Sequence, residues 1–546
     1  MPYVITQNCC KDASCVTVCP VNCIHPAPPE DGFATEPMLY VDPRACIDCG
    51  ACADACPVDA IVPADTLRGP EQVYIRLNAD HFEGKPVEPV SGPLFRSWDN
   101  PTFDWSLPGD FAGLDVAVVG TGPAGLYAAE LLLLHTRSTV TLIDRLPMAG
   151  GLIRYGVAPD HPGTKRIGHT FARLYGHPRV RMLLGLDVGA AVTTEQLAEH
   201  FDAVIYAVGA SVGKRLGIPG EDLPGSITAP DFVGWYNAHP DIAADTVSLA
   251  GERAVVVGTG NVALDVARIL SSDPATLEGT DIADHALAAL RDRPVAEVVL
   301  LGRRGPDDAA YSAPELLALR EMHERHGVEL VVDDHDPRTG AAIDAAAAGA
   351  TAGLLQGLRR IRPDYADPPA AGRRIVLRFH ETVAAVDGDE RVTGVRLSGG
   401  EDVRAGLLVT AIGYGGRPVP GLPFDEANGV VPNDSGRVDG VAGAYAVGWC
   451  KRGSSGGIGD NRVDAAETVR TLLDDAVAGR LAGDRRGSKR FARTAARAAA
   501  DHVDADGLRR ILAAEADRGR RAGRPAAKFA TVHELVGASR RRRLPG

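Results

Sequence analysis

The distribution of cysteines is the feature that most restricts what this chain can fold into. Nine of its ten cysteines fall within residues 9–56, and only Cys450 lies beyond them. A cytosolic protein would keep so dense a group reduced, and the start, MPYVITQNCC, lacks the basic-then-apolar layout of a signal peptide. We therefore expect a cytoplasmic protein whose clustered cysteines bind metal rather than form disulfides.

The spacing of these cysteines is typical of iron–sulfur proteins. The downstream run comprises Cys46, Cys49, Cys52 and Cys56. Two residues lie between each of the first three cysteines, three residues lie between the third and the fourth, and a proline follows directly. The upstream run repeats this spacing with one carboxylate: Cys9, Asp12, Cys15 and Cys19. Three thiolates of such a run hold one cluster and the fourth reaches another, whereas zinc would take its four ligands in pairs. The sequence therefore predicts two iron–sulfur clusters.

Residues 1–62 resemble the two-cluster ferredoxins of the seven-iron type. The resemblance implies a [4Fe–4S] cluster held by Cys19, Cys46, Cys49 and Cys52. It implies a second cluster held by Cys9, Cys15 and Cys56, with Asp12 where a fourth ligand would stand. Because a carboxylate binds this iron more weakly than a thiolate, we expect a [3Fe–4S] cluster or a labile [4Fe–4S] cluster there. Cys10 could replace Cys9, although its spacing breaks the pattern; otherwise Cys10 and Cys23 are expected to be free, buried thiols.

Two glycine-rich turns follow apolar, β-branched runs and precede helix-like segments. The first comprises Gly120, Thr121, Gly122, Pro123, Ala124 and Gly125, and Asp144 ends the next apolar run about 20 residues later. Such a turn brings backbone N–H groups to a pyrophosphate, and a carboxylate at the later position binds ribose hydroxyls. The first turn therefore predicts a dinucleotide site.

The second turn comprises Gly258, Thr259, Gly260, Asn261, Val262 and Ala263. Here the next apolar run, EVVLLG, ends in Arg303 and Arg304 instead of an acid. Guanidinium groups bind phosphate with planar, charge-assisted hydrogen bonds, whereas a carboxylate would repel the 2′-phosphate of NADP. The second turn therefore predicts an NADP(H) site.

From about residue 115 to 475 the chain resembles the adrenodoxin reductase group of ferredoxin–NADP reductases. The matching segments are GTGPAGLYAAELLL, GGLIRYGVAPDHP, GTGNVALDVARIL, LGRRGP and GWCKRGSSGGI. The resemblance implies FAD at Gly120, Gly122, Pro123, Ala124, Gly125, Asp144, Arg145, Leu152, Trp449, Gly456, Gly457 and Ile458. It implies NADP(H) at Gly258, Gly260, Asn261, Val262, Arg303, Arg304 and Glu315. It also places His161 and Asp265 near the flavin as polar residues associated with hydride or electron transfer, although His161 could instead only fix its own loop. The chain departs from the family at Gly459-Asp460-Asn461, where a threonine-rich stretch is common.

These motifs predict an α/β protein with two doubly wound, Rossmann-like domains behind a small α+β ferredoxin domain. We expect the ferredoxin domain at 1–83, a linker at 84–109, the FAD domain at 110–210 and 411–480, the NADP domain at 211–410, and a basic helical extension at 481–546. We also expect a strand at 73–77 and few essential contacts across the proline-rich linker, whose Trp98, Phe103 and Trp105 would lie against a surface. The arginine-rich end is expected to be a solvated surface, or else a docking patch for an acidic carrier.

The predicted activity is that of a ferredoxin–NADP reductase. Hydride passes from NADPH to FAD, and single electrons pass to the fused clusters or to an external ferredoxin or another one-electron acceptor, such as a cytochrome P450 system. A net charge of −13 disfavours nucleic acid as the partner, and no apolar run reaches the roughly 18 residues that suggest a membrane span. Two alternatives stay open: an electron-input subunit like that of glutamate synthase, and an iron–sulfur redox sensor. Cys450 has no CxxC partner, which disfavours a disulfide reductase.

Overall fold

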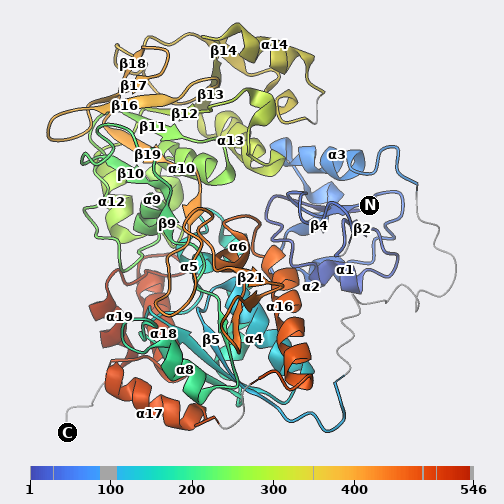
Figure 1. Cartoon of the computed structure of the whole chain (residues 1–546). Helices are drawn as coiled ribbons and strands as arrows, with labels where there is room; N and C mark the ends of the chain where they lie inside the picture. Colours follow the sequence, from blue (N-terminus) through green and yellow to red (C-terminus); the bar gives the residue numbers. More distant parts are fainter. Residues whose placement is uncertain are drawn as a thin grey trace.

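Two seven-stranded sheets form the body of the computed structural model, and a small cysteine-containing module lies beside them (Figure 1). The structure describes residues 2–28, 30–86, 107–347, 350–481, 485–499 and 501–540. Most of the proline-rich segment, with Trp98, Phe103 and Trp105, lies outside the described residues. Within these ranges, no helix combines the length and the apolar character that crossing a membrane would require.

The first sheet forms from short β-branched runs such as VAVV (116–119), which is buried. Its order is β21-β22-β23-β8-β5-β6-β7, and the strands from β23 to β7 are parallel. The strands are β5 (Asp115–Val119), β6 (Thr139–Asp144), β7 (Val180–Leu184), β8 (Ala203–Tyr206), β21 (Asn433–Asp434), β22 (Arg437–Val438) and β23 (Ala444–Ala446). The helices are α4 (Pro123–His135), α5 (Leu152–Tyr155), α6 (Pro162–Lys165), α7 (Ile167–Tyr175), α8 (Thr194–His200), α15 (Trp449–Arg452) and α16 (Asp460–Val477).

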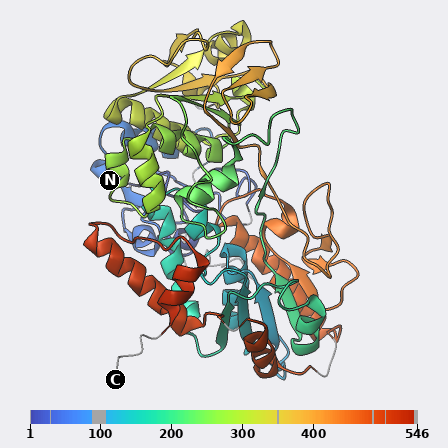
Figure 2. The same cartoon turned by 90° about the vertical axis from the view of Figure 1, so that its left-hand side faces the viewer.

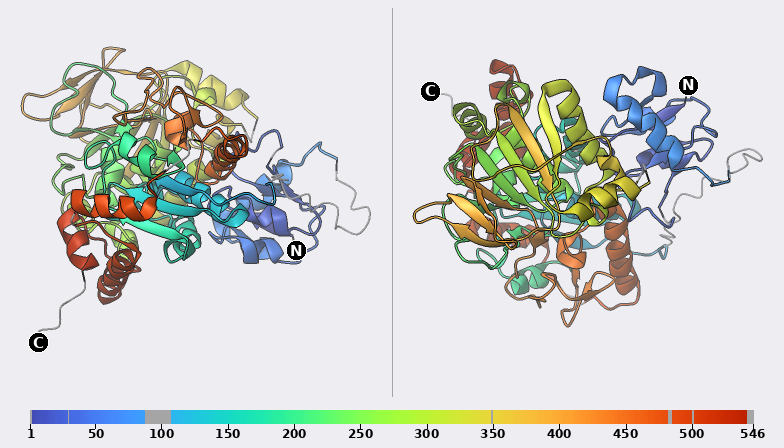
Figure 3. Two further views of the ribbon diagram at one scale, coloured as in Figure 1. Left: turned by 60° about the horizontal axis from the view of Figure 1, so that its bottom comes forward. Right: turned by 90° about the horizontal axis from the view of Figure 1, so that it is seen from above.

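The second sheet is wholly parallel, in the order β10-β19-β11-β12-β15-β13-β14 (Figure 3). Its strands are β10 (Ser226–Thr228), β11 (Arg253–Val257), β12 (Glu297–Leu301), β13 (Val328–Asp333), β14 (Arg359–Ile361), β15 (Arg373–Arg378) and β19 (Leu407–Thr410). The helices are α9 (Ala229–Tyr236), α10 (Asn261–Ser271), α11 (Pro274–Leu277), α12 (Asp284–Asp292), α13 (Ala313–His326) and α14 (Pro337–Ala345). An antiparallel sheet follows: β16 (Val383–Asp387), β17 (Gly394–Leu397) and β18 (Asp402–Arg404).

The second sheet is inserted into the first, between β8 and β21 in the sequence. The two chain segments that connect the sheets carry short strands, β9 (Val212–Gly213) and β20 (Tyr414–Gly415), which pair antiparallel. The carboxyl ends of β5 and of β11 each lead into one of the glycine-rich turns. The fold therefore presents each turn at the edge of a parallel sheet where ligands are commonly bound.

The cysteine module is built from two matching halves. Its elements are β1 (Tyr3–Ile5), α1 (Ser14–Val18), β2 (Ile24–His25), β3 (Tyr40–Val41), α2 (Ala51–Ala55), β4 (Ile61–Pro63) and α3 (Val73–Asp80). Strand β1 pairs with β4, and β2 pairs with β3, both antiparallel. Helix α1 contains Cys15 and ends at Cys19, and α2 contains Cys52 and ends at Cys56. The two end cysteines share nearly the same backbone, with φ of −73° and ψ of 114° or 115°.

Residues 73–77 form part of a helix, so the expected strand is wrong. Helix α3 buries Tyr74 and Asn78, which lie one helical turn apart. The Asn78 amide accepts hydrogen bonds from Ile5 N at 3.1 Å and Val41 N at 2.9 Å, and donates one to Ile5 O at 2.8 Å. This side chain supplies hydrogen-bond partners to buried backbone groups of β1 and β3, which would be costly to leave unpaired. Such tertiary contacts override the preference of a β-branched segment for a strand.

The cysteine module contacts both parts of the body directly, so contacts do cross the linker (Figures 1 and 3). Cys10 O accepts a hydrogen bond from Gly459 N at 2.8 Å, before α16. Arg325 of α13 donates one to Arg68 O at 3.4 Å. Buried side chains of the module belong to the same apolar core as those of α4 and α16. The composition of a linker says nothing about the surfaces of the domains that it joins.

The arginine-rich C-terminal segment is anchored in the body, so a solvated surface describes it only in part (Figure 2). Its helices are α17 (Ser488–Ala498), α18 (Ala505–Arg521) and α19 (Val532–Ser539). Glu515, only 1% exposed, accepts a hydrogen bond from Arg154 at 2.6 Å. Lys528 Nζ lies 2.7 Å from Asp281 Oδ2 and donates to Asn237 Oδ1 at 3.0 Å. The C-terminal segment thus forms hydrogen bonds and ion pairs with residues of both parts of the body.

Candidate functional site

The first glycine-rich turn is shaped by contacts that exclude side chains. Gly120 has a φ of +108°, and a Cβ atom there would lie 2.2 Å from Ala207 O. A Cβ atom on Gly125 would lie 2.2 Å from Gly120 O, whereas none of the surrounding protein atoms comes within 4 Å of a Cβ on Gly122. The turn is thus tight at its ends and open at Gly122, directly before α4. An open backbone at a helix N-terminus suits a phosphate group.

Asp144 ends β6 and braces this turn. Its Oδ2 accepts hydrogen bonds from Thr121 N at 2.8 Å and Thr121 Oγ1 at 2.6 Å, and its Oδ1 accepts one from Leu146 N at 3.0 Å. Burial raises the pKa of Asp144, although these hydrogen bonds oppose the rise. The carboxylate retains acceptor capacity for a ribose hydroxyl. The neighbouring Arg145 forms an ion pair with Asp241, and Leu152 begins α5 directly after the glycine pair 150–151.

The second turn repeats this arrangement before α10. Gly258 has a φ of +133°, and a Cβ atom there would lie 2.4 Å from Ala411 O. The nearest atom to a Cβ on Gly260 is 3.9 Å away, so this position is open. Asn261 begins α10 and accepts a hydrogen bond from Ser312 N at 2.8 Å, and Val262 is half-buried beside it.

Arg303 and Arg304 lie just beyond β12 and are exposed. Arg304 Nη1 is 3.2 Å from Asp308 Oδ1, and these side chains are 60% and 52% exposed. A surface pair of this kind contributes little to stability. Both guanidinium groups are therefore accessible to a ligand at the edge of the second sheet.

His161, Asp265 and Glu315 meet in space, although they come from three separate segments. One ligand atom of each lies within 4.8 Å of the others. The buried Arg268 joins the two carboxylates: its guanidinium is 2.5 Å from Asp265 Oδ1 and 3.3 Å from Glu315 Oε2. It is also 2.6 Å from Asp160 Oδ2.

One guanidinium therefore balances three carboxylates beside an imidazole. Burial would raise the pKa of Asp160, but Arg268 lowers it to about 2. Burial and the charge of Asp265 raise the pKa of Glu315. His161 lies beside groups that can exchange a proton with it or hold it in place. Sequence reasoning missed Arg268, for which the signal was an arginine three residues after Asp265 on α10.

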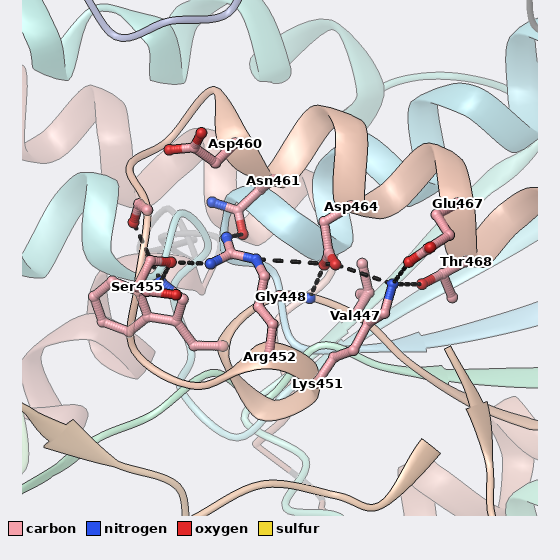
Figure 4. A network of polar contacts seen from close by, with 12 residues as sticks. Val447, Gly448, Lys451, Arg452, Ser455, Asp460, Asn461, Asp464, Glu467 and Thr468 are labelled. Atoms are coloured by element: carbon pink, nitrogen blue, oxygen red, sulfur yellow. Dashed lines mark hydrogen bonds and ion pairs between the residues drawn. The ribbon is translucent and has the colours of Figure 1, made fainter. Parts of the chain in front are cut away.

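The segment 448–458 is held by the first turns of α16 (Figure 4). Asp464 accepts a hydrogen bond from Gly448 N and lies 3.0 Å from Lys451 Nζ. Trp449 Nε1 donates to Ser455 O at 3.0 Å, which closes the loop on itself.

The exposed end of this segment is fixed by a second acid of α16. Asp460 Oδ2 accepts a hydrogen bond from Gly457 N at 2.5 Å. Gly456 and Gly457 are exposed, and Ile458 packs against the core that the first sheet shares with the cysteine module. Asp460 and Asp464 were not among the residues predicted from the sequence, although two acids four residues apart at a helix start are a recognisable signal.

The structure gathers the cysteines of the module into two groups. In the first group, Cys9, Asp12, Cys15 and Cys56 lie close enough to influence one another electrostatically. In the second group, one cavity is lined by Cys19, Cys46, Cys49 and Cys52, together with Tyr3 and Cys23. Cys23 Sγ lies 3.4 Å from Cys19 Sγ, and Cys10 is buried next to the first group.

These groups have the donor chemistry of iron–sulfur sites. Burial raises the pKa of Cys9 and of Cys52 to about 11, so both would stay protonated unless a cation bound to them. Asp12 is buried and accepts a hydrogen bond from the Ser14 hydroxyl. Two sets of converging ligands, of which the first is the more buried, fit two clusters.

Comparison with known proteins agrees with this architecture. The pyridine nucleotide-disulphide oxidoreductase family model matches residues 114–333, and the 4Fe-4S binding domain model matches residues 39–62. The chain is 43% identical to a probable ferredoxin/ferredoxin–NADP reductase of Mycobacterium tuberculosis, over 99% of this chain and 95% of that protein. The chain belongs to the ferredoxin/ferredoxin–NADP reductase family.

Two further relatives each cover about three quarters of this reductase. Human mitochondrial NADPH:adrenodoxin oxidoreductase is 37% identical, over 77% of this chain and 91% of that protein. The structure of Mycobacterium tuberculosis FprA in complex with NADPH matches with a TM-score of 0.71 and 39% identity, over 78% of this chain and all of that one. The reductase therefore has the α/β fold with parallel sheets of this family.

Proposed function

We propose that this reductase transfers electrons between NADPH and ferredoxin-type carriers, with FAD as the intermediate carrier. NADPH releases two electrons as a hydride and an iron–sulfur cluster accepts one at a time, and flavin joins the two because it exchanges both hydride and single electrons. The proposal rests chiefly on the placement of two glycine-rich turns at the edges of two connected parallel sheets, with the cysteine module in direct contact with α16. The names of the relatives support it.

In the first site, the backbone at Gly122 binds the pyrophosphate of FAD and Asp144 binds a ribose. The remaining proposed contacts are Gly120, Pro123, Ala124, Gly125, Arg145 and Leu152, with Trp449, Gly456, Gly457 and Ile458 covering the flavin. Asp460 and Asp464 hold this covering segment in place.

In the second site, Gly258, Gly260, Asn261 and Val262 bind the pyrophosphate of NADP(H). Arg303 and Arg304 bind the 2′-phosphate, to which their exposure makes them accessible. Glu315 binds the nicotinamide half, and His161 and Asp265 line the place where hydride is transferred. Arg268 pairs with the carboxylates of Asp265 and Glu315 and holds them in position.

The cysteine module is proposed to hold a [4Fe–4S] cluster on Cys19, Cys46, Cys49 and Cys52. Its other cluster, on Cys9, Cys15 and Cys56 beside Asp12, is proposed to be a [3Fe–4S] cluster or a labile [4Fe–4S] cluster. The external partner is a ferredoxin or another one-electron acceptor, such as a cytochrome P450 system.

Anaerobic mixing of the holoprotein with NADPH tests this function. The flavin absorbance should bleach first and the iron–sulfur absorbance should follow, and NADH should be much less effective. Cytochrome c added as a one-electron acceptor should then be reduced. If NADPH left the flavin oxidised, or if neither the clusters nor the added acceptor were reduced, the proposed function would be wrong.

A further inference from the structure

The two cysteine groups have opposite surroundings. The loop 9–14, which carries ligands of the first group, lies against the residues before and within the first turn of α16. The second group lies at the exposed end of the module: Cys49 is exposed, and the Ile47 side chain beside it is 58% exposed. One group therefore faces the body of the reductase and the other faces solvent.

The contact at the inner group is made largely through backbone atoms of the loop 9–14. Gly459 N donates to Cys10 O at 2.8 Å, and Arg462 Nη1 donates to Asp12 O at 2.7 Å. A Cβ atom on Gly459 would lie 1.9 Å from Lys11 O, so the two segments approach as closely as their main-chain atoms allow. This loop is thus held in one position against α16.

A buried ion pair continues the contact towards the flavin-covering segment. Lys11 Nζ lies 3.2 Å from Asp460 Oδ1, and these side chains are 8% and 13% exposed. The other oxygen of Asp460 accepts the hydrogen bond from Gly457 N. A single carboxylate therefore links the loop of the first cysteine group to the segment proposed to cover the flavin.

We propose that electrons enter the cysteine module only at the cluster of Cys9, Cys15 and Cys56, and leave it at the cluster of Cys19, Cys46, Cys49 and Cys52. Electron tunnelling falls steeply with distance, so the cluster held against α16 accepts from the flavin and the exposed one delivers to an outside protein. Each step moves one electron: the reduced flavin loses it, the inner cluster gains it and is reoxidised as the outer cluster is reduced. The cycle runs twice for each NADPH. Lys11, Asp460 and Arg462 act as positioning residues, and the inference rests on the proposed function.

Removing each cluster in turn tests this order. In the full-length holoprotein, Cys15→Ser disrupts the inner cluster and Cys49→Ser the outer one, and freeze-quench EPR follows each cluster after anaerobic mixing with NADPH. Relative to flavin bleaching in the same sample, Cys15→Ser should slow reduction of the outer cluster by about tenfold or more, although dithionite still reduces it. Cys49→Ser should leave the inner cluster reducible by NADPH and slow cytochrome c reduction to a similar degree. If the outer cluster of Cys15→Ser were reduced as fast as in the wild type, relative to flavin bleaching, the proposal would be overturned.

If the cysteine variants lose both clusters, a substitution of Lys11 tests the same electron route. Lys11→Glu breaks the pair with Asp460 and should slow inner-cluster reduction, relative to flavin bleaching, by about tenfold or more. Lys11→Arg keeps the charge and should restore the rate. Lys85→Glu, the same change on an exposed part of the module, is the matched control. Iron content and the dithionite-reduced EPR spectrum establish that the clusters are intact.

The outcomes separate the inference from the function. A flavin that NADPH does not bleach contradicts the proposed function. A flavin that bleaches normally, with Lys11→Glu behaving like Lys85→Glu, contradicts only the inferred route.

Discussion

Replacing Asp281 with asparagine should destabilise the reductase strongly, because this carboxylate balances two buried lysines from distant parts of the chain. Its oxygens lie 2.6 Å from Lys165 Nζ and 2.7 Å from Lys528 Nζ, and its side chain is 17% exposed. Lys165 belongs to α6, and Lys528 belongs to the C-terminal segment. Both ammonium groups also donate to Asn237 Oδ1, a neutral acceptor that cannot replace the charge.

The expected loss follows from the pKa of Asp281. Burial would raise this pKa, but Lys528 and Lys165 lower it to about 2 from its ordinary 3.8. The difference of about 1.8, at about 1.36 kcal/mol for each pKa unit, corresponds to about 2.4 kcal/mol. Because the folded pKa is depressed, this stabilisation is present above about pH 4 and is lost as the pH falls towards 2. The substitution would also leave the ammonium groups of Lys165 and Lys528 without a countercharge, which adds to the loss. We therefore expect the free energy of unfolding to fall by about 3–5 kcal/mol in total at pH 7.

Guanidinium unfolding of the holoprotein at pH 7, followed by tryptophan fluorescence, would show this loss as a lower midpoint at an unchanged slope. Asp222→Asn is the matched control, because Asp222 is 92% exposed and pairs with Arg215 at the surface, where about 0.5 kcal/mol is at stake. Lys528→Met should cost much less than Asp281→Asn, since burial and the charge of Lys165 already lower the pKa of Lys528. Equal midpoints for Asp281→Asn and Asp222→Asn would refute this reasoning.

Three further predictions concern the proposed cofactor sites. Replacing Arg303 and Arg304 together with alanine should raise KM for NADPH by about tenfold or more and leave NADH kinetics nearly unchanged, since each charge-assisted bond contributes about 1.5–3 kcal/mol; equal losses for both coenzymes would contradict a role in 2′-phosphate binding. Asp12→Cys should abolish the EPR signal of an oxidised [3Fe–4S] cluster and add about one iron atom per chain, and a wild type without that signal would argue against this cluster type. Gly120→Ala should yield protein without flavin absorbance, because its Cβ would lie 2.2 Å from Ala207 O, whereas Gly176→Ala, with no atom within 4 Å, should retain FAD.

Patterns local to the chain were sufficient to predict the family and its activity. The cysteine spacing and the two glycine-rich turns are short, and each has a chemical meaning that does not depend on distant residues. The relatives confirm the ferredoxin–NADP reductase, and the two parallel sheets confirm the α/β class. The individual site residues and the cluster types stay predictions.

Contacts between distant segments could not be predicted in the same way. Helix α3 forms where composition favoured a strand, because Asn78 pairs with backbone of β1 and β3. Arg268 gathers carboxylates from three segments, and Lys528 reaches Asp281 across almost half of the chain.

The contact between Gly459 and Cys10 depends even more on the tertiary structure, since 448 residues lie between the two in the sequence. The sequence of neither segment by itself indicates that the two are in contact. The amino-acid sequence thus determined which cofactors and chemistry this reductase has the motifs for, because those motifs are local. Only the packing of the module against α16 decided which cysteine group faces the body, because burial and distance belong to the folded chain as a whole.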